Sequence, residues 1–149
     1  MRGIPADQSI LIVIDGGKGL HRAVAEVFGE YTVVQRCQVH KRRNVLDHLP
    51  DERRAQVRGA MSQAYAAESY EVALRQLENL ARTLIKAHPS VAESLREGLK
   101  ETLTVKRLGL TGALAKTMET SNPIENMNGW IRRVTRRVKH CRGGQMALG

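Results

Sequence analysis

The sequence predicts strands only within residues 9–36, and this feature limits the possible folds more than any other. Residues 9–14 form an apolar, β-branched run without alternation, which is typical of a short strand covered on both faces in a parallel sheet. Apolar residues then recur at helical spacing over residues 20–28 until Gly29, and residues 31–36 predict a second strand. This order predicts two parallel neighbouring strands joined by a crossover.

From residue 38 onward the apolar spacing is helical almost throughout. It predicts helices over about residues 51–66 and 70–87, a capping box of Ser90 and Glu93 at the start of the next helix, and a last helix from Asn122 to about residue 140. Because two strands cannot make a self-sufficient sheet, either helices wrap the two-strand unit or its strands belong to a larger sheet. The residues alone predict a mainly helical fold with one βαβ unit.

The charge balance points to a polyanionic partner. Lys and Arg number 24 against 15 Asp and Glu, which gives a net charge of +9 and a pI near 10.2. Hydrophobic residues at 42% and charged residues at 26% are close to globular averages and exclude a wholly disordered chain. The longest apolar run, residues 10–14, is too short for a membrane span, so we expect a cytoplasmic protein with no membrane partner. Two cysteines, Cys37 and Cys141, exclude a disulfide framework.

Asp15 directly follows the first predicted strand. In α/β sheets the crevice beyond the carboxyl ends of the strands collects ligands and catalytic groups, which makes Asp15 a candidate catalytic residue. The alternative is that Asp15 only caps the helix that begins near Lys18, as Asp often does. Residues 15–19 lack the spacing of a phosphate-binding loop, so that kind of site is excluded for this segment.

Cys37 and His40 have the C-x-x-H spacing of half a zinc site. The other cluster of these residue types is His140 with Cys141, whose side chains would point apart on a helix, so a local packing pair at the strand-to-helix corner is favoured over zinc. The basic residues around the motif form either a solvated helix start or a patch that contacts phosphates. We favour the patch, which consists of Arg36, Lys41, Arg42 and Arg43.

The last predicted helix carries two stripes of side chains. Its apolar stripe repeats at helical spacing, is expected to pack into the core, and consists of Ile124, Met127, Ile131, Val134 and Val138. The neighbouring stripe places one carboxylate at the head of a polar and then cationic row: Glu125, Asn128, Arg132 and Arg136. Gly129 removes a side chain one turn after Glu125, which suits a carboxylate that holds a metal ion while arginines neutralise phosphates. The plainer alternative is a capping box of Asn122 and Glu125, and the two roles do not exclude each other.

Positive charge is concentrated after Thr120. Residues 120–149 carry six cations against the single acid Glu125, and these cations are Arg132, Arg133, Arg136, Arg137, Lys139 and Arg142. The segment therefore holds more than half of the net charge of +9. An evenly solvated surface would not concentrate charge in this way, so we expect the segment to contact nucleic acid.

Three segments of the sequence resemble the bacterial Mutator-type insertion-sequence transposases. Residues 14–20 read IDGGKGL, residues 34–46 read VQRCQVHKRRNVL, and residues 120–133 read TSNPIENMNGWIRR. They occur in the family's order along nearly the whole chain, and the three together carry the resemblance. The family has an RNase H-like core in which two aspartates and one glutamate bind divalent metal and cut and rejoin DNA.

The resemblance implies roles for particular residues. Asp15 matches the family's second aspartate and Glu125 its glutamate, so both are expected to be catalytic and to hold Mg²⁺ or Mn²⁺ in a two-metal site. The remaining matches are Cys37 and His40 in the family's C-x-x-H signature, and Asn122 and Asn126 in the segment around Glu125. The implied partner is double-stranded DNA, both at the ends of the mobile element and at its target.

The resemblance also implies an α/β fold class, with a partial RNase H-like catalytic domain over residues 1–149 and an all-helical insertion at about 51–117. The family's first aspartate lies on an early strand well upstream of the second, yet only 14 residues precede Asp15, and Asp7 has no predicted strand before it. We therefore expect a truncated chain with little or no activity alone. The alternative is a non-catalytic DNA-binding or interaction module that self-associates or associates with a full-length transposase. A generic RNA-binding protein would explain neither Asp15 nor residues 122–133.

Overall fold

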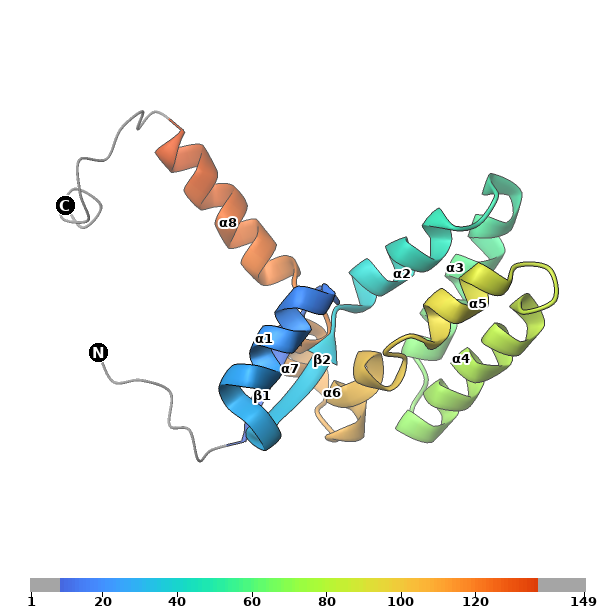
Figure 1. The fold of residues 1–149 in the computed structure, drawn as a ribbon, viewed down its shortest axis with the longest axis horizontal. Coiled ribbons are helices and arrows are strands. Elements are labelled where there is room, and N and C mark those ends of the chain that lie inside the picture. Colours follow the sequence, from blue (N-terminus) through green and yellow to red (C-terminus); the bar gives the residue numbers. More distant parts are fainter. Residues whose placement is uncertain (1–8, 137–149) are drawn as a thin grey trace.

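The computed structural model describes residues 9–136, with the side chain of Glu30 excepted. The chain begins with strand β1 (Ile10–Ile14), helix α1 (Lys18–Phe28), a short 3-10 turn η1 (Gly29–Tyr31) and strand β2 (Thr32–Arg36). The remaining elements are α2 (Gln38–Asp47), α3 (Asp51–Tyr65), α4 (Tyr70–Leu84), α5 (Pro89–Arg96), η2 (Lys100–Leu103), α6 (Thr104–Arg107), α7 (Gly112–Met118) and α8 (Asn122–Thr135). Figure 1 shows the two strands and α1 beside the group formed by α2 to α5, with α8 extending away from both.

The predicted βαβ unit is confirmed. The two strands pair in parallel, from Ile10 opposite Thr32 to Ile14 opposite Arg36. Helix α1 ends at Gly29, whose φ of +56° is a conformation that glycine adopts without strain. The expectation that the first strand is covered on both faces is wrong for most of its length, because Ile14 alone in β1 is buried and the residues before it are half-buried.

The free edge of β2 is covered by side-chain hydrogen bonds instead of a third strand. The hydroxyl of Thr104 in α6 donates to the Val34 carbonyl at 2.6 Å. The Gln35 side chain accepts from the Val105 N–H at 2.9 Å and donates to the Thr102 carbonyl at 2.9 Å. The Thr104 contact satisfies a β2 carbonyl, and the Gln35 contacts bind the backbone of η2 and α6 to the strand. The segment formed by η2 and α6 therefore packs along β2 where the described residues place no third strand.

The hydrophobic core lies among helices α2 to α5, with Leu99 and Leu103 from the segment that follows. Its fully buried members include Val45, Met61, Leu77, Val91 and Leu95. On α4 the buried residues Ala73, Leu77 and Ala81 belong to this core, and the half-buried Leu80 and Leu84 pack against it. Within residues 9–136, no helix is long and apolar enough to cross a membrane.

Two predicted details of the helix ends are wrong. The helix from Tyr70 ends at Leu84, three residues before the predicted end. Helix α5 begins at Pro89 with His88 before it and without a side-chain cap, so Ser90 and Glu93 do not form the predicted capping box. Proline favours the first helical position, which places the start of the helix one residue earlier than Ser90.

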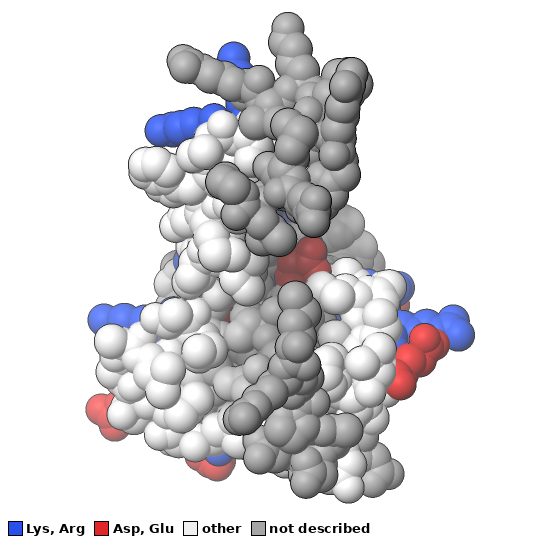
Figure 2. Space-filling view, turned by 90° about the vertical axis from the view of Figure 1, so that its left-hand side faces the viewer, with Lys and Arg blue, Asp and Glu red and all other residues white. Residues whose placement is uncertain are grey.

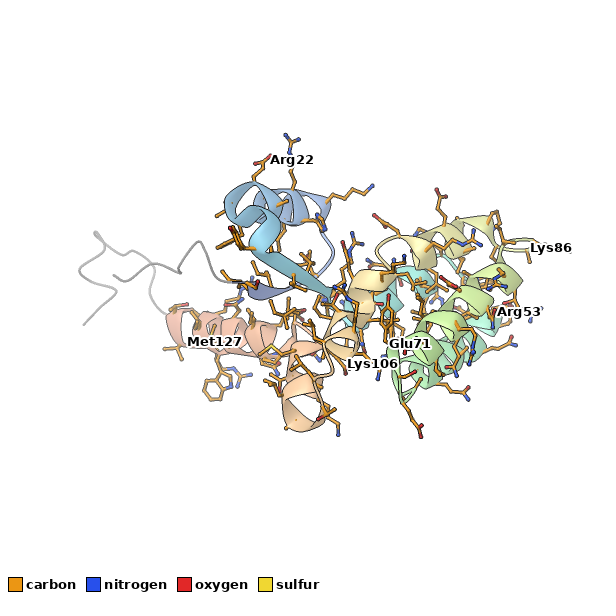
Figure 3. All side chains as sticks on the ribbon, turned by 90° about the horizontal axis from the view of Figure 1, so that it is seen from below. Arg22, Arg53, Glu71, Lys86, Lys106 and Met127 are labelled. Carbon is orange, nitrogen blue, oxygen red and sulfur yellow. The ribbon has the colours of Figure 1, made fainter. Side chains whose placement is uncertain are left out.

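The prediction that α8 packs into the core is also wrong. No residue of α8 is buried, and its apolar side chains are 50% to 68% exposed: Ile124, Met127, Trp130, Ile131 and Val134. Figure 3 places Met127 on α8 well apart from the helices that carry Glu71 and Arg53. Helix α8 extends away from the body, so its stripe has no facing element among the described residues; Val138, the last predicted member, lies outside them.

Candidate metal and nucleic-acid site

The two strands end side by side, and each is followed by a residue with ligating chemistry. Ile14 and Arg36 are the last paired residues, so Asp15 and Cys37 leave the sheet at the same edge. The Cys37 N–H donates to the Ile14 carbonyl at 2.7 Å, which holds the two exits together. This is the carboxyl edge of a parallel sheet, where ligand sites form in α/β proteins.

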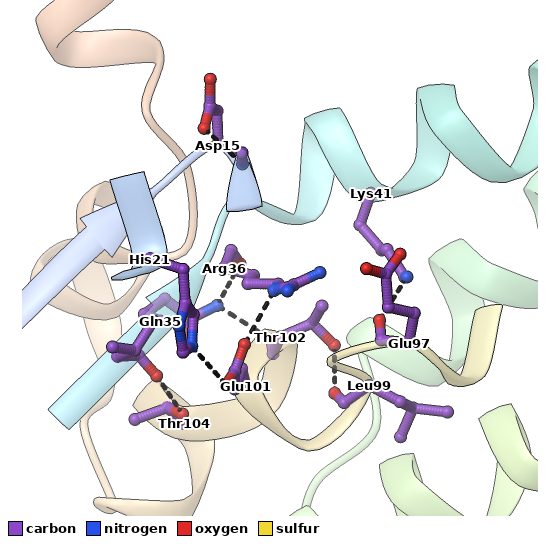
Figure 4. Close-up of polar contacts among 12 residues, drawn as sticks. Asp15, His21, Gln35, Arg36, Lys41, Glu97, Leu99, Glu101, Thr102 and Thr104 are labelled. Atoms are coloured by element: carbon purple, nitrogen blue, oxygen red, sulfur yellow. Dashed lines mark hydrogen bonds and ion pairs between the residues drawn. The ribbon is translucent and has the colours of Figure 1, made fainter. Parts of the chain in front are cut away.

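Asp15 is exposed at this edge. Its Oδ1 accepts a hydrogen bond from the Gly17 N–H at 2.9 Å, which orients the carboxylate. The N-cap of α1 is Gly17 and not Asp15, so the simple capping interpretation does not describe the geometry. In Figure 4 the Asp15 carboxylate points away from the ion pair of Arg36 and Glu101. Asp15 therefore presents a carboxylate to solvent at the edge of the sheet.

Glu125 lies in the first turn of α8 and reaches back toward the same edge. Its Oε1 accepts from the hydroxyl of Ser121 and lies 3.6 Å from His40 Nδ1. The N-cap of α8 is Ser121, not Asn122, and its side chain binds the Glu125 carboxylate instead of capping the backbone. The predicted capping box is therefore replaced by a side-chain contact, and the Glu125 side chain remains 49% exposed.

Cys37 and His40 form a hydrogen-bonded pair at the corner between β2 and α2. His40 Nδ1 lies 3.3 Å from Cys37 Sγ and 3.2 Å from Ser121 Oγ, and the Ser121 N–H donates to Cys37 Sγ at 3.2 Å. Burial raises the pKa of the Cys37 thiol, but hydrogen bonds from Ser121 and His40 stabilise the thiolate, and the net pKa lies below its ordinary value. The motif thus contacts Ser121, on the segment that leads into α8.

In the basic patch predicted around Cys37 and His40, two of the four cations are buried and bind other groups of the protein. The Arg36 Nε donates to Glu101 Oε2 at 2.7 Å, and His21 binds the other oxygen of Glu101 at 3.0 Å (Figure 4). The Lys41 ammonium donates to the carbonyls of Ser94 and Glu97, and burial lowers its pKa from 10.5 to about 8. Arg36 and Lys41 therefore hold the helical segment against β2 and α2.

The other two cations line a groove between α2 and α3. This groove encloses about 250 Å³ and is lined by four arginines with one acid, Asp47; the arginines are Arg42, Arg43, Arg54 and Arg58. The Arg42 guanidinium donates to Ser62 Oγ at 3.1 Å and lies 5.9 Å from the centre of the Tyr65 ring, which keeps it oriented. Sequence reasoning missed Arg54 and Arg58, although their spacing of four residues on a predicted helix places them on one face.

Helix α8 carries a second cationic surface. Arg132, Arg133 and Arg136 are exposed on it, and Figure 2 shows blue side chains standing out from the upper part of the molecule, which α8 occupies. Arg137, the fourth predicted arginine, lies outside the described residues. Beside Glu125 the surface of α8 has an open hollow at Gly129, which Asn126, Trp130 and Arg133 also line. Trp130, which sequence reasoning missed, is 67% exposed under the Arg133 guanidinium.

The described residues offer a pair of carboxylates and not a closed metal cage. No group of three His, Cys, Asp or Glu residues within residues 9–136 is arranged to hold a metal ion. Mg²⁺ is commonly bound by one or two carboxylates together with waters and substrate phosphates, and Asp15 and Glu125 are exposed carboxylates of the kind that such a site uses. Asn122 and Asn126 lie exposed in the first turns of α8 on either side of Glu125 in the sequence.

Comparison with known proteins gives consistent results along the chain. The family model described as "Transposase, Mutator family" matches residues 1–147. The transposase for insertion sequence element ISRM3 of Rhizobium meliloti is 32% identical over 95% of this chain, and that for IST2 of Acidithiobacillus ferrooxidans is 27% identical over 94%. The transposase for IS905 of Lactococcus lactis is 29% identical over 87%. The chain spans 35%, 46% and 32% of the lengths of these three relatives.

Proposed function

Because this chain belongs to the Mutator family of transposases, we propose that it forms part of a catalytic domain that cuts and rejoins duplex DNA with divalent metal ions. The observation that carries the proposal is the shared edge of the sheet. Asp15 leaves β1 there, Cys37 leaves β2 there, and Ser121 connects that edge to Glu125. Two carboxylates from distant parts of the sequence thus belong to one end of the fold.

We assign Asp15 and Glu125 as ligands of Mg²⁺ or Mn²⁺. A two-metal site supplies an activated water or 3′-hydroxyl and stabilises the leaving oxygen of the phosphodiester. Each carboxylate is exposed and keeps an oxygen for a ligand after its hydrogen bond within the protein. In the RNase H-like arrangement that we propose, the third carboxylate comes from outside residues 9–136, and the helices within about 51–117 form an insertion.

We propose that the DNA is bound mainly through its phosphates. The cations available for this are those of the α8 surface, Arg132, Arg133 and Arg136, and those of the groove between α2 and α3. A duplex held by arginine–phosphate contacts binds without sequence preference and dissociates as salt concentration rises. Glu125 lies on the same helix as the first set, so the proposed metal site adjoins the phosphates bound there.

A second candidate function is a DNA-binding or interaction module without catalysis. It is favoured by one observation, which is that the arginines and the apolar side chains of α8 are exposed within the described residues. In this case the exposed α8 surface would bind DNA, and Asp15 and Glu125 would serve only the local structure. The same module would self-associate or associate with a longer transposase through its exposed apolar stripe.

Nicking of labelled duplex DNA by the purified chain in Mg²⁺ or Mn²⁺ separates the two candidates. The catalytic proposal predicts that cleavage depends on Glu125, so Glu125→Ala abolishes nicking while salt-sensitive DNA binding is retained. Arg75→Ala is a matched control, because Arg75 is an exposed residue of α4 that lines neither cationic surface. Binding without nicking by the unaltered chain is expected of both candidates where the third carboxylate lies outside the chain. The non-catalytic module is then favoured only if Asp15→Ala and Glu125→Ala bind Mn²⁺ as the unaltered chain does.

A further inference from the structure

Helix α8 has no buried residue, so hydrophobic packing does not determine where Glu125 lies. What joins the start of α8 to the rest of the fold is a set of polar contacts at one point. The Gln38 N–H donates to the Glu119 carbonyl at 3.0 Å, and the Ser121 N–H donates to Cys37 Sγ at 3.2 Å. Each of these two hydrogen bonds joins the segment just before α8 to the corner after β2. The position of Glu125 therefore depends on this corner.

We propose that Cys37, His40 and Ser121 form a clasp that positions the Glu125 carboxylate at the carboxyl edge of the sheet. Cys37 is its base, because its side chain is fully buried and its N–H is bound to the Ile14 carbonyl. Ser121 is the link, because its backbone binds Cys37 and its hydroxyl binds Glu125. These three are positioning residues. The metal-binding role of Glu125 rests on the proposed function, whereas the clasp itself does not.

The hydrogen bonds of the clasp are mutually consistent with one arrangement of protons. An ionised carboxylate only accepts, so the single hydroxyl proton of Ser121 is donated to Glu125. Ser121 Oγ must then accept from His40 Nδ1, which lies 3.2 Å away, and Cys37 Sγ accepts from the same ring nitrogen at 3.3 Å. The clasp therefore requires the His40 proton on Nδ1 whenever the ring is neutral.

The first test uses the full chain without metal. Long-range ¹H–¹⁵N spectra of the histidine rings, with the His40 signals identified by their loss in His40→Gln, report which nitrogen carries the proton. We expect Nδ1–H in the unaltered chain, and a change in this signature in Ser121→Ala but not in Ser121→Thr, which retains the hydroxyl. A neutral His40 with its proton on Nε2 would contradict the clasp.

The second test measures the affinity for Mn²⁺ alone by electron paramagnetic resonance. Removing a partner that orients a metal ligand costs about 10–100-fold in metal affinity, so we expect a loss of that size in Ser121→Ala and recovery in Ser121→Thr. Ser69→Ala is the control for stability, because Ser69 caps α4 through the Val72 N–H and lies outside the clasp. It is expected to bind Mn²⁺ like the unaltered chain.

The outcomes distinguish the clasp from the proposed function. If Glu125→Ala loses Mn²⁺ affinity while Ser121→Ala does not, Glu125 is a ligand but the clasp does not position it, and the inference is wrong. If Glu125→Ala binds Mn²⁺ as tightly as the unaltered chain, the metal site proposed for Glu125 is wrong, and so is the positioning role. The ring-nitrogen signature would still show in that case whether the clasp forms.

Discussion

Helices α4 and α8 carry similar apolar stripes and have opposite environments. In α4 the stripe is buried, with Ala73, Leu77 and Ala81 fully inside the core between neighbouring helices. In α8 the corresponding stripe is exposed at every described position, and no described element faces it. The difference shows that helical spacing of apolar residues reports amphipathicity, whereas burial depends on whether a partner surface exists at that place in the fold.

The charges of the two regions differ in the same way. In the helical body, Arg36 and Lys41 are buried and bound to Glu101 or to backbone carbonyls, so these charges stabilise the structure. On α8 the arginines are exposed, and Arg133 lies over the exposed Trp130 ring. The cations of this chain are therefore of two kinds. Buried cations bind other groups of the protein, and only exposed cations can contact the phosphates of a nucleic acid.

The largest effect on the free energy of unfolding is expected when one apolar side chain is truncated in each of the two stripes and the results are compared. Leu77→Ala in α4 should lower the free energy of unfolding by about 2–5 kcal/mol, because it leaves a cavity in a closed core. Ile131→Ala in α8 should change it by less than about 0.5 kcal/mol, because the side chain is already 50% exposed. Urea denaturation of both variants measures the difference. A cost of 2 kcal/mol or more at Ile131 would mean that the α8 stripe is covered in solution.

The next largest effect concerns the buried cation Arg36. Gly98 has a φ of +60°, and a Cβ at this position would lie 2.5 Å from the Arg36 guanidinium. Gly98→Ala should therefore displace Arg36 from Glu101 and lower the free energy of unfolding by about 2–3 kcal/mol. The matched control is Gly109→Ala, because Gly109 also has a positive φ, +71°, but nothing lies within 4 Å of an added Cβ, so it should cost only the roughly 1–2 kcal/mol of the left-handed conformation. Equal effects of the two substitutions would show that Arg36 is not held closely at Gly98.

The buried ammonium gives a pH dependence. Burial, with a contribution from Arg36, lowers the pKa of Lys41 to about 8 in the folded chain, against 10.5 when exposed. Between these values the unfolded chain binds the proton that the folded chain has released, so stability rises with pH. From pH 8 to pH 10, the free energy of unfolding should rise by about 2 kcal/mol relative to Lys41→Met.

The comparison with Lys41→Met cancels the other groups that titrate in this range. Glu97 and Glu101 oppose the lowered pKa of Lys41, and both are present in Lys41→Met. Tyr65, whose pKa burial raises from 10 to about 12, lowers stability as pH approaches and passes 10, and this effect cancels because both proteins contain Tyr65. A difference between the two proteins that stays constant from pH 8 to pH 10 would show that the Lys41 ammonium is solvated.

The sequence predicts most elements of this fold, but not the partners of each surface. The apolar run at residues 10–14, the helical spacing up to Gly29 and the next β-branched run define the βαβ unit, because these local periods differ so clearly. The burial of Arg36 and Lys41 was not predictable, since it depends on Glu101 and on carbonyls more than 50 residues away. Such contacts leave no local pattern.

The same limit applies to the candidate site. Asp15, Cys37 and Glu125 can each be singled out from their sequence context, but no local signal assigns a function to Ser121. Its role follows from contacts 81 and 84 residues distant, with His40 and Cys37. The prediction of Asn122 as the N-cap of α8 misses by one residue, and that single residue contributes the hydroxyl that contacts Glu125.

The smallest expected effect concerns the exposed arginines of α8 and the salt dependence of DNA binding. Arg132→Ala and Arg136→Ala should each reduce the slope of log affinity against log salt for duplex DNA by about 0.9, because each removes one phosphate contact. Neither should alter the free energy of unfolding by more than about 0.5 kcal/mol, since both side chains are exposed. Titrations of labelled duplex at several salt concentrations provide the slopes.

The matched control is again Arg75→Ala, which removes an equal charge from the exposed surface of α4. If binding depended only on the net charge of +9, all three substitutions would weaken it alike. A reduced slope for the α8 variants with an unchanged slope for Arg75→Ala would instead locate the contacts on α8. An unchanged slope in all three would move the phosphate contacts to the groove between α2 and α3, where Arg58→Ala is the corresponding variant.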